Sequence, residues 1–421
     1  MTCSFQADYV DFTQDDSTLR QRDSSKSPSG TLALQEQYKC SVSLMDRPRV
    51  LDGDSRLLCD PMMKTSTFIP GTYTLADLEL MHHYVTKTFF LLADYEAYRP
   101  VWEMIVPREA QANEFLMRGI LALSALHIGH LREKVSNGSS HERQKVLSYY
   151  EAAQRHYNHA VSGFNTTVKH MTPANTNAVF AFSHLSIFFA FGSSSPTTLH
   201  SSRAIPFLLP SSQAHCPENL DSPIDSLLSV VTLLRKSMTV LRSSWALLEE
   251  SSMAVLLQRG PQITNRMYLP GEIRDALNRL KTLILVHPEL SSDVAKRNIY
   301  LTALSTLTSS FVMAETKRQD WPMALRFAML VSEKFLGYIR AREPLALVFL
   351  AYYCVLLHRA PARWWAGGWA GWVVKEIWAR LEGTKMWRER EIVEWCASLV
   401  VGKCGNLCDK GSINQLESSV N

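Results

Sequence analysis

From Leu75 to about residue 402, apolar side chains recur at steps of three and four residues, and this spacing constrains the fold more than any other feature. Such steps place side chains on one face of an α-helix. The first stripe consists of Leu75, Leu78, Met81, Val85, Phe89 and Leu92. The sequence shows no alternation of apolar and polar residues between turn signals, the pattern typical of strands. We therefore predict an all-α fold, a multi-helix bundle or array.

The same pattern predicts a series of further helices. Pro107 and Glu109 suit a first helical turn, and the helix that they open carries Gly119, a small residue that lets a neighbouring helix approach closely. The remaining helices are expected at about 143–166, 176–192, 224–257, 271–286, 291–316, 322–341, 344–359, 369–383 and 389–402. The helix that ends at Gly192, a residue suited to a left-handed C-terminal position, is apolar nearly all round. We expect it at the centre of the fold and not across a membrane.

Three segments lack the helical pattern. Residues 1–70 mix polar residues with isolated apolar ones and are predicted to be largely disordered. Residues 193–223 are rich in Ser, Pro and Thr, which predicts a mobile loop, and 403–421 are predicted to form a flexible tail. This leaves 75–402 as one helical domain. The net charge of +4 is too small to indicate a nucleic-acid-binding face by itself.

A few residues have the spacing of metal ligands. Three pairs fall three residues apart: Glu79 with His82, His127 with His130, and His156 with His159. A di-iron bundle needs two Glu-x-x-His units, and the sequence has one. Three cysteines near the end, Cys396, Cys404 and Cys408, lack an obvious fourth zinc ligand. We interpret these as ordinary histidines and free thiols, and expect no metal and no cofactor.

Motifs of catalysis are missing as well. The sequence contains no G-x-S-x-G elbow and no glycine-rich phosphate loop after a strand. An α-helical enzyme therefore stays a remote alternative, and we expect the protein not to be an enzyme.

Aromatic residues are concentrated between Tyr352 and Trp378. The group comprises Tyr352, Tyr353, Trp364, Trp365, Trp369, Trp372 and Trp378, with His358 and Arg359 among them. Such side chains supply a large apolar area with a polar group at the edge, which suits a pocket for a flat apolar ligand. The same residues could instead join three helices as core. The sequence leaves both interpretations open.

A further pattern is spread over six segments: Asp77–Tyr84, Val101–Trp102, Glu114–His127, Tyr149–Tyr150, Leu350–His358 and Trp364–Trp365. Together they resemble the C-terminal regulatory region of fungal binuclear zinc-cluster transcription factors, nearest to the sterol uptake control proteins. The resemblance covers about residues 75–400. It implies an all-helical effector domain that works in the nucleus and can shuttle to the cytoplasm.

In sterol-responsive members of that family, the domain binds ergosterol in an apolar pocket. The resemblance therefore implies a sterol-like ligand here. The candidate lining residues are Phe188, Phe189, Met323, Tyr352, Tyr353, His358, Trp364, Trp365 and Trp369.

The sequence departs from the family at the DNA-reading module. That module uses six cysteines in paired C-x-x-C knuckles, whereas only Cys3, Cys40 and Cys59 precede residue 75, none of them in such a knuckle. We therefore expect no direct sequence-specific DNA contact from this chain. The partners would be transcription proteins, a DNA-binding paralogue or a second copy. A gene model lacking the exon for this module remains an alternative, as does an apolar-ligand sensor or carrier with no transcriptional role.

Overall fold

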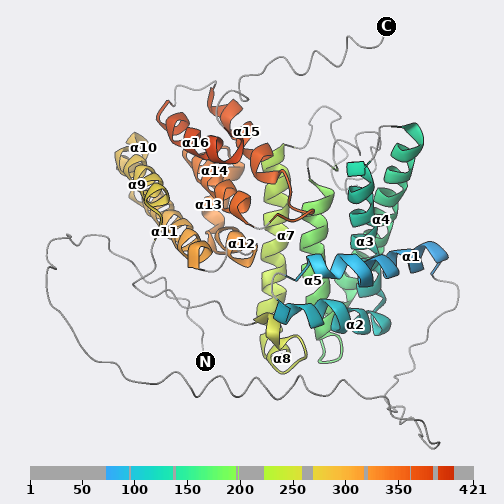
Figure 1. Ribbon diagram of the computed structural model, residues 1–421. Coiled ribbons are helices and arrows are strands. Elements are labelled where there is room, and N and C mark those ends of the chain that lie inside the picture. The colour runs from blue at the N-terminus through green and yellow to red at the C-terminus, as the bar shows by residue number, and fades with distance from the viewer. Residues whose placement is uncertain are drawn as a thin grey trace, which may run out of the picture. The chain divides into compact units, whose positions relative to one another are not determined.

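The computed structural model describes residues 73–93, 96–135, 139–195, 198, 222–257, 269–316, 321–360, 362–382 and 387–402. All of them belong to the unit Thr67–Asn421. Within these ranges every regular element is helical, which confirms the predicted all-α class (Figure 1). The disorder predicted for 1–70, most of the loop predicted at 193–223 and the tail predicted at 403–421 lie outside the described residues.

The described residues form a series of α-helices. In chain order they are α1 (Leu75–His83), α2 (Val106–Ala112), α3 (Glu114–Val135), α4 (Ser140–Thr167), α5 (Thr176–Ser193), α7 (Pro223–Ser243), α8 (Trp245–Glu249), α9 (Gly271–Val286), α10 (Pro288–Ser292), α11 (Val294–Thr316), α12 (Trp321–Leu330), α13 (Glu333–Arg340), α14 (Pro344–Arg359), α15 (Trp369–Glu382) and α16 (Trp387–Val400). Shorter π and 3₁₀ turns are η1 (Tyr84–Thr88), η2 (Phe89–Leu91), η3 (Glu96–Tyr98), η4 (Val101–Ile105) and η6 (Ala254–Leu257).

Several predicted helices are divided where one residue leaves the helical conformation. Asn113, with φ −133° and ψ 96°, separates α2 from α3. Asp293, with φ −110° and ψ 90°, separates α10 from α11. Ser332, with φ −65° and ψ 150°, begins α13 as an N-cap whose hydroxyl accepts a hydrogen bond from Phe335 N. The apolar period continues across these breaks, so periodicity alone could not locate them.

The first predicted stripe was expected to be buried, and for its first members this prediction was wrong. Leu75 is 85% and Leu78 61% exposed, whereas Leu80 and Tyr84 are buried. The chain passes from α1 into the π turn η1, and a π turn adds a residue to the helical turn and shifts the phase of the faces. Phe89 then returns to the buried side as predicted.

A polar network attaches α1 to the rest of the domain. Thr74 and Asp77 form a capping box, in which Thr74 N donates to Asp77 Oδ2 at 2.8 Å and Asp77 N donates to Thr74 Oγ1 at 3.3 Å. The other carboxylate oxygen of Asp77 lies 2.9 Å from His156 Nε2 on α4. Asp77 and His156 are both buried. Two orphan N–H groups at the start of α1 and one buried imidazole are thereby satisfied.

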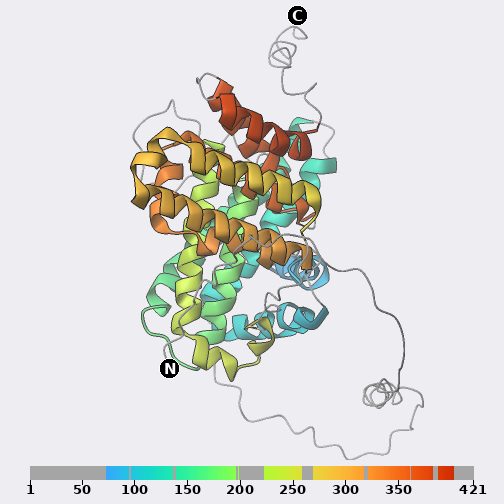
Figure 2. The same cartoon turned by 90° about the vertical axis from the view of Figure 1, so that its left-hand side faces the viewer.

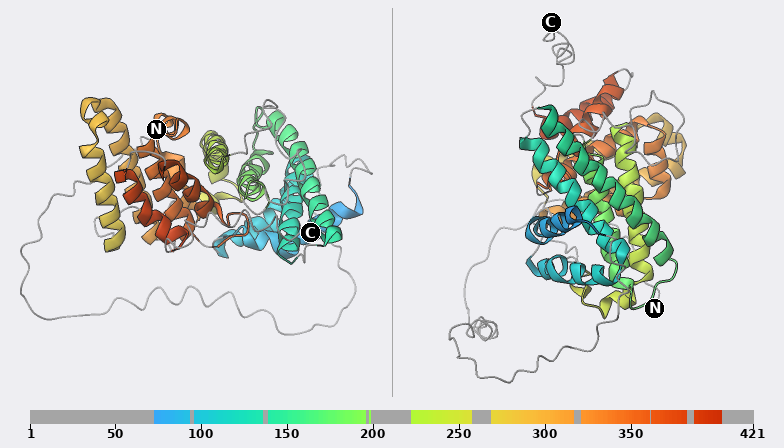
Figure 3. Two further views of the ribbon diagram at one scale, coloured as in Figure 1. Left: turned by 90° about the horizontal axis from the view of Figure 1, so that it is seen from above. Right: turned by 90° about the vertical axis from the view of Figure 1, so that its right-hand side faces the viewer.

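Helix α5 occupies the core, as predicted. It contacts α3 on one side and α7 on the other, and both neighbours can be followed in Figures 1 and 3. A methyl group at Gly119 of α3 would lie 2.7 Å from Phe182 Cδ2 of α5, so the small residue does permit the close approach. By length and composition α5 could cross a membrane, but 72% of it is buried inside the protein. The bent pair α13–α14 passes the same test only as one broken span.

The core consists of two hydrophobic clusters. The N-terminal cluster is built by α1 to α5 with Leu248, Met253 and Leu257, and the C-terminal cluster by α5, α7 and the helices from α9 onward. Figure 2 shows the outer layer of the C-terminal cluster, where α9 and α11 lie side by side. Phe188 and Trp364 pack against both clusters. These two residues mark the junction at which the candidate site lies.

Candidate ligand site

Trp365 is the centre of an aromatic junction between the two clusters. It lies in the turn between α14 and α15, and Gly368, with φ 81°, lets the chain enter α15 from that turn. The ring centroid of Trp365 is 4.5 Å from that of Trp321 on α12 and 5.0 Å from that of Phe188 on α5. Phe191 is a third neighbour, at 5.5 Å. Trp365 is 2% exposed, and its three ring neighbours come from the two helices α5 and α12.

Trp364 points to the other cluster. Its indole is stacked on the imidazole of His127, with 4.7 Å between ring centroids and 16° between planes. His130, one turn further along α3, lies 5.6 Å from the same indole. Trp365 thus belongs to the C-terminal cluster, and Trp364 packs against both clusters.

Trp369 and Gly192 close the junction on the α5 side. Trp369 Nε1 donates a hydrogen bond to the carbonyl oxygen of Phe191 at 3.0 Å. A methyl group at Gly192 would lie 3.0 Å from Leu126 Cδ2 and 3.2 Å from Trp364 Cζ3. Gly192 is inside α5 and is not among the described residues with positive φ, so its predicted left-handed conformation was wrong. Glycine is needed there for space, because α3 and the Trp364–Trp365 turn approach α5 closely.

Several polar atoms at the junction are buried without a hydrogen-bond partner. They are the indole nitrogens of Trp364 and Trp365 and the Nε2 atom of His130. Buried polar groups are nearly always paired, and an unpaired one costs about 1–3 kcal/mol. Trp369, with its bond to Phe191, shows the usual arrangement. Trp364 and Trp365 can therefore donate hydrogen bonds to an acceptor that lies among apolar rings.

The histidines under Trp364 are held neutral by burial. His127 Nδ1 lies 3.2 Å from His83 Nε2 and 3.0 Å from Thr88 Oγ1. Burial lowers the pKa of His127 to about 3, and the nearby His83 and His130 contribute to the same shift. Burial likewise lowers the pKa values of His83 and His130 to about 4. At neutral pH the group therefore adds no charge to the junction.

The structure divides the nine predicted ligand residues between several places. Phe188, Trp364, Trp365 and Trp369 meet at the junction. Phe189 faces away from it and stacks on Tyr157, with centroids 4.0 Å apart. Their role as a ligand wall stays a prediction.

The remaining members of that set lie on α12 and α14. Met323 is half-buried against the C-terminal cluster. Tyr352 donates to the carbonyl oxygen of Ala276 at 2.9 Å, and Tyr353 lies beside Phe327, with centroids 5.4 Å apart. His358 is exposed.

The residues with metal-ligand spacing have other contacts. Among the described residues, no group of three or more His, Cys, Asp or Glu side chains is placed to hold a metal ion. Cys354 and Cys396 are buried free thiols, and burial raises the pKa of each. Cys404 and Cys408 lie outside the described residues.

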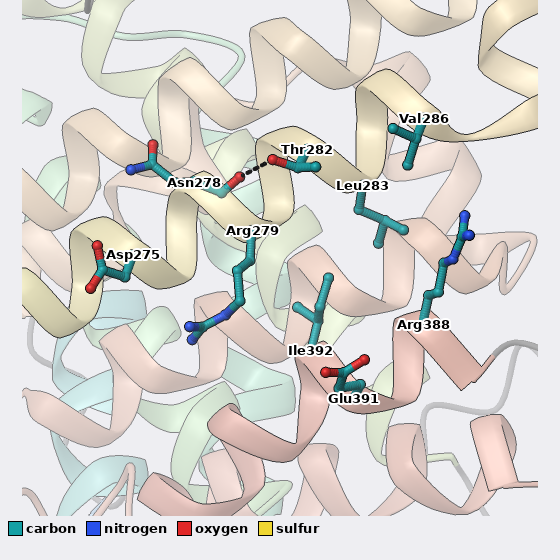
Figure 4. A pocket seen from close by; sticks show the side chains of 9 residues that line it. All are labelled: Asp275, Asn278, Arg279, Thr282, Leu283, Val286, Arg388, Glu391 and Ile392. Carbon is teal, nitrogen blue, oxygen red and sulfur yellow. Dashed lines mark hydrogen bonds between the residues drawn. The ribbon is translucent and has the colours of Figure 1, made fainter.

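Two surface hollows lie away from the junction. A groove of about 820 Å³ runs between α9 and α16, as Figure 4 shows. A hollow of about 630 Å³ lies between the start of α3 and the second half of α4, where Arg118 and His159 are among its lining residues. None of the nine predicted ligand residues lines either hollow.

Sequence reasoning missed part of the junction. Phe191 and Trp321 contact Trp365, and His83 contacts His127, yet none of these three was among the predicted ligand residues. Phe191 follows Phe188 by three residues on the same apolar helix, and that spacing could have indicated it. No local signal connects Trp321 or His83 with the Trp364–Trp365 turn.

Comparison with known proteins gives two findings that agree with this architecture. Residues 79–210 match the family model of the fungal specific transcription factor domain. A Zn(2)-C6 fungal-type transcription factor from Gibberella zeae is 25% identical over 353 residues, which cover 80% of this chain and 64% of that protein. The chain is thus a distant relative of that transcription factor, and the match spans less than two thirds of the relative's length. The matched range 79–210 contains α2, α3, α4 and α5, and therefore one side of the junction.

Proposed function

We propose that this chain is the regulatory region of a fungal transcription regulator. The observation that carries the proposal is the match of residues 79–210 to the fungal specific transcription factor domain. The distant similarity to a Zn(2)-C6 fungal-type transcription factor supports it along most of the chain. The site of action is the nucleus. The targets are fungal metabolic or biosynthetic-cluster genes.

The chain acts as a regulator without chemistry of its own. The described residues offer packed aromatic rings and neutral histidines at the junction, an arrangement that suits binding. The 421 residues contain no six-cysteine reader, since three cysteines precede residue 75 and none is in a C-x-x-C knuckle. Contact with DNA therefore comes from a partner protein or from a segment outside these 421 residues.

The regulatory signal is an apolar, sterol-like small molecule that enters the junction. The apolar body of the ligand takes the place of the contacts among Phe188, Trp364 and Trp365. Trp369 lies at the edge of the bound ligand. An acceptor oxygen on the ligand receives hydrogen bonds from the unpaired indole nitrogens. Because Trp364 packs against both clusters and Trp365 belongs to the C-terminal one, a ligand that separates these rings changes how the two clusters pack.

A reporter assay tests the regulatory role. The full chain is fused to a zinc-cluster DNA reader of known specificity and placed over a reporter gene in yeast. We expect activation or repression relative to the reader alone, and we expect Trp365→Ala to alter it. Trp378→Ala is the matched control, because Trp378 is a half-buried tryptophan outside the junction. Reporter expression equal to that of the reader alone, in every growth condition, would contradict the proposal.

The unpaired indole nitrogens also favour a second candidate, an apolar-ligand sensor or carrier with no transcriptional role. Native mass spectrometry of the full chain with ergosterol tests binding directly. Ligand at about 100 times its dissociation constant should stabilise the fold by roughly 2.7 kcal/mol. Ligand retention together with a silent reporter would favour the carrier, and no retention with no thermal shift would exclude both ligand roles.

A further inference from the structure

The groove between α9 and α16 is lined by charged side chains that have no role in the proposed function. One face of α9 supplies its wall at steps of three and four residues, and α16 supplies the opposite side. The lining residues are Asp275, Asn278, Arg279, Thr282, Leu283, Val286, Arg388, Glu391 and Ile392. From Asp275 to Val286 the helix rises about 16 Å, so the groove is long enough for a helix face.

Contacts near both ends of the groove define how α9 and α16 lie against each other. His287 Nε2, just after α9, lies 3.8 Å from Glu389 Oε1 at the start of α16. Near the other end, Tyr352 of α14 donates to the carbonyl oxygen of Ala276, and its ring also lies 5.2 Å from that of Trp395 on α16. The start of α16 thus lies beside the end of α9, and the two helices run in opposite directions.

The charges of the groove are arranged with opposite signs at its two ends. Figure 4 shows Asp275 at one end and Arg388 at the other, beside Val286. Arg279 and Glu391 lie between them, so the lining residues balance to zero charge. Asp275 and Arg388 are both exposed. A two-fold rotation about the middle of such a groove places each end opposite the end of the other sign.

The groove also presents apolar surface to solvent. Leu283 and Ile392 form its floor, while Val286 at the rim and Leu285 beside it are each 50% exposed. Exposed apolar side chains framed by charges are typical of surfaces that meet another protein.

We propose that the α9–α16 groove binds the same groove of a second copy of this chain. The contact is isologous, so that Asp275 of each copy faces Arg388 of the other and the Val286 rims enter the opposite grooves. The charge complementarity of the groove with itself argues for a second copy over an unrelated partner. Arg279 and Glu391 then form the inner pair of opposite charges.

Charge reversal in the full chain tests the proposal by sedimentation velocity. We expect Asp275→Arg and Arg388→Glu each to weaken self-association at least about tenfold, because each places like charges together at both ends of the contact. An equimolar mixture of these two variants should dimerise again, since one copy then carries two arginines and the other two acidic residues at the facing positions. This recovery on mixing is specific to a two-fold contact.

Matched controls lie on the same helix outside the groove. Glu272→Arg and Lys281→Glu reverse exposed charges of α9 that do not line it, and both should self-associate as the wild type does. If a reversal unfolds the chain, Asp275→Asn and Arg388→Gln replace it. Each should weaken the dimer, and their mixture should recover only in part, because one of the two Asp275–Arg388 pairs is then intact.

Three results would overturn the proposal. One is a wild-type chain that stays monomeric up to about 100 μM. Another is a dimer that neither reversal weakens. The third is a pair of monomeric variants that fail to associate when mixed, which would assign the groove to a different protein.

Discussion

The imidazole of His127 lies nearly parallel to the indole of Trp364, with 4.7 Å between the ring centroids. His127 belongs to the N-terminal cluster and Trp364 to the turn that precedes α15, so one stacked pair connects the range that matches the transcription factor domain with the C-terminal helices. Trp365, the next residue, inserts between α5 and α12. The two clusters should therefore unfold together.

The buried histidines predict that stability depends on pH. Their pKa values of about 3 to 4 in the folded protein lie below the value near 6.5 of an unfolded chain. Between about pH 6.5 and pH 4 the unfolded chain therefore binds more protons, and the free energy of unfolding falls as the pH is lowered. His127→Phe keeps a ring over Trp364 and removes one titrating group. This substitution should reduce the slope of the free energy of unfolding against pH by up to about 1.4 kcal/mol per pH unit. Urea unfolding at several pH values measures that slope.

An unchanged slope in His127→Phe would mean that His127 is protonated or exposed in the folded protein, contrary to the structure.

Trp365→Ala should be among the most damaging single substitutions in the domain. The ring is 2% exposed and contacts three other aromatic rings, so its removal leaves a large cavity. We expect a loss of about 3–5 kcal/mol in the free energy of unfolding. Trp378→Ala removes a half-buried ring over which the Arg390 guanidinium lies, 4.9 Å away, and should cost less. Equal and small losses in both variants would show that Trp365 is not core.

Two phenylalanine substitutions separate the role of the indole N–H from that of the ring. Trp369→Phe removes the hydrogen bond to Phe191 O and leaves that buried carbonyl unsatisfied, at a cost of about 1–3 kcal/mol beyond the change in ring size. Trp365→Phe removes an N–H that has no partner, so it should cost less than Trp369→Phe. Chemical unfolding of both variants gives the comparison, and the reverse order would contradict the assigned hydrogen bonding.

Two glycines in helices should respond to alanine in opposite directions. At Gly119 the added methyl group meets the buried ring of Phe182, and we expect a loss of about 1–3 kcal/mol. At Gly371 of α15 nothing lies within 4 Å, so the higher helix propensity of alanine should add up to about 1 kcal/mol. Thermal unfolding measures both. A gain at Gly119 would mean that α3 and α5 do not approach as closely as described.

Periodicity was sufficient to predict the helices and the buried faces of the long ones. Phe115, Ile120 and Leu126 of α3 are buried as predicted, as are Val146 and Tyr150 of α4. The errors fall where local backbone geometry changes without a change in composition. The π turn after α1 rotated the face that carries Leu75 and Leu78 into solvent, and Asn113 and Asp293 ended helices that the apolar stripe appeared to continue.

The candidate site was harder to predict because its contacts are long-range. Trp364 and Trp365 were singled out from their neighbours in sequence, yet His127, Phe191 and Trp321 reach them from α3, α5 and α12. Tyr352 and Tyr353 belong to the same aromatic run but point to α9 and α12, since successive residues on a helix face different directions. Closeness along the chain therefore does not show which aromatic side chains contact one another.

Transcript profiling tests most directly whether this chain regulates transcription. RNA is sequenced from a fungal strain in which the gene is deleted and from the same strain complemented with the full chain. We expect a defined set of metabolic or biosynthetic-cluster genes whose transcripts change on deletion and recover on complementation, with incomplete recovery for Trp365→Ala. Transcript levels that do not differ between the deletion strain and the complemented strain, for any gene under any growth condition, would contradict it.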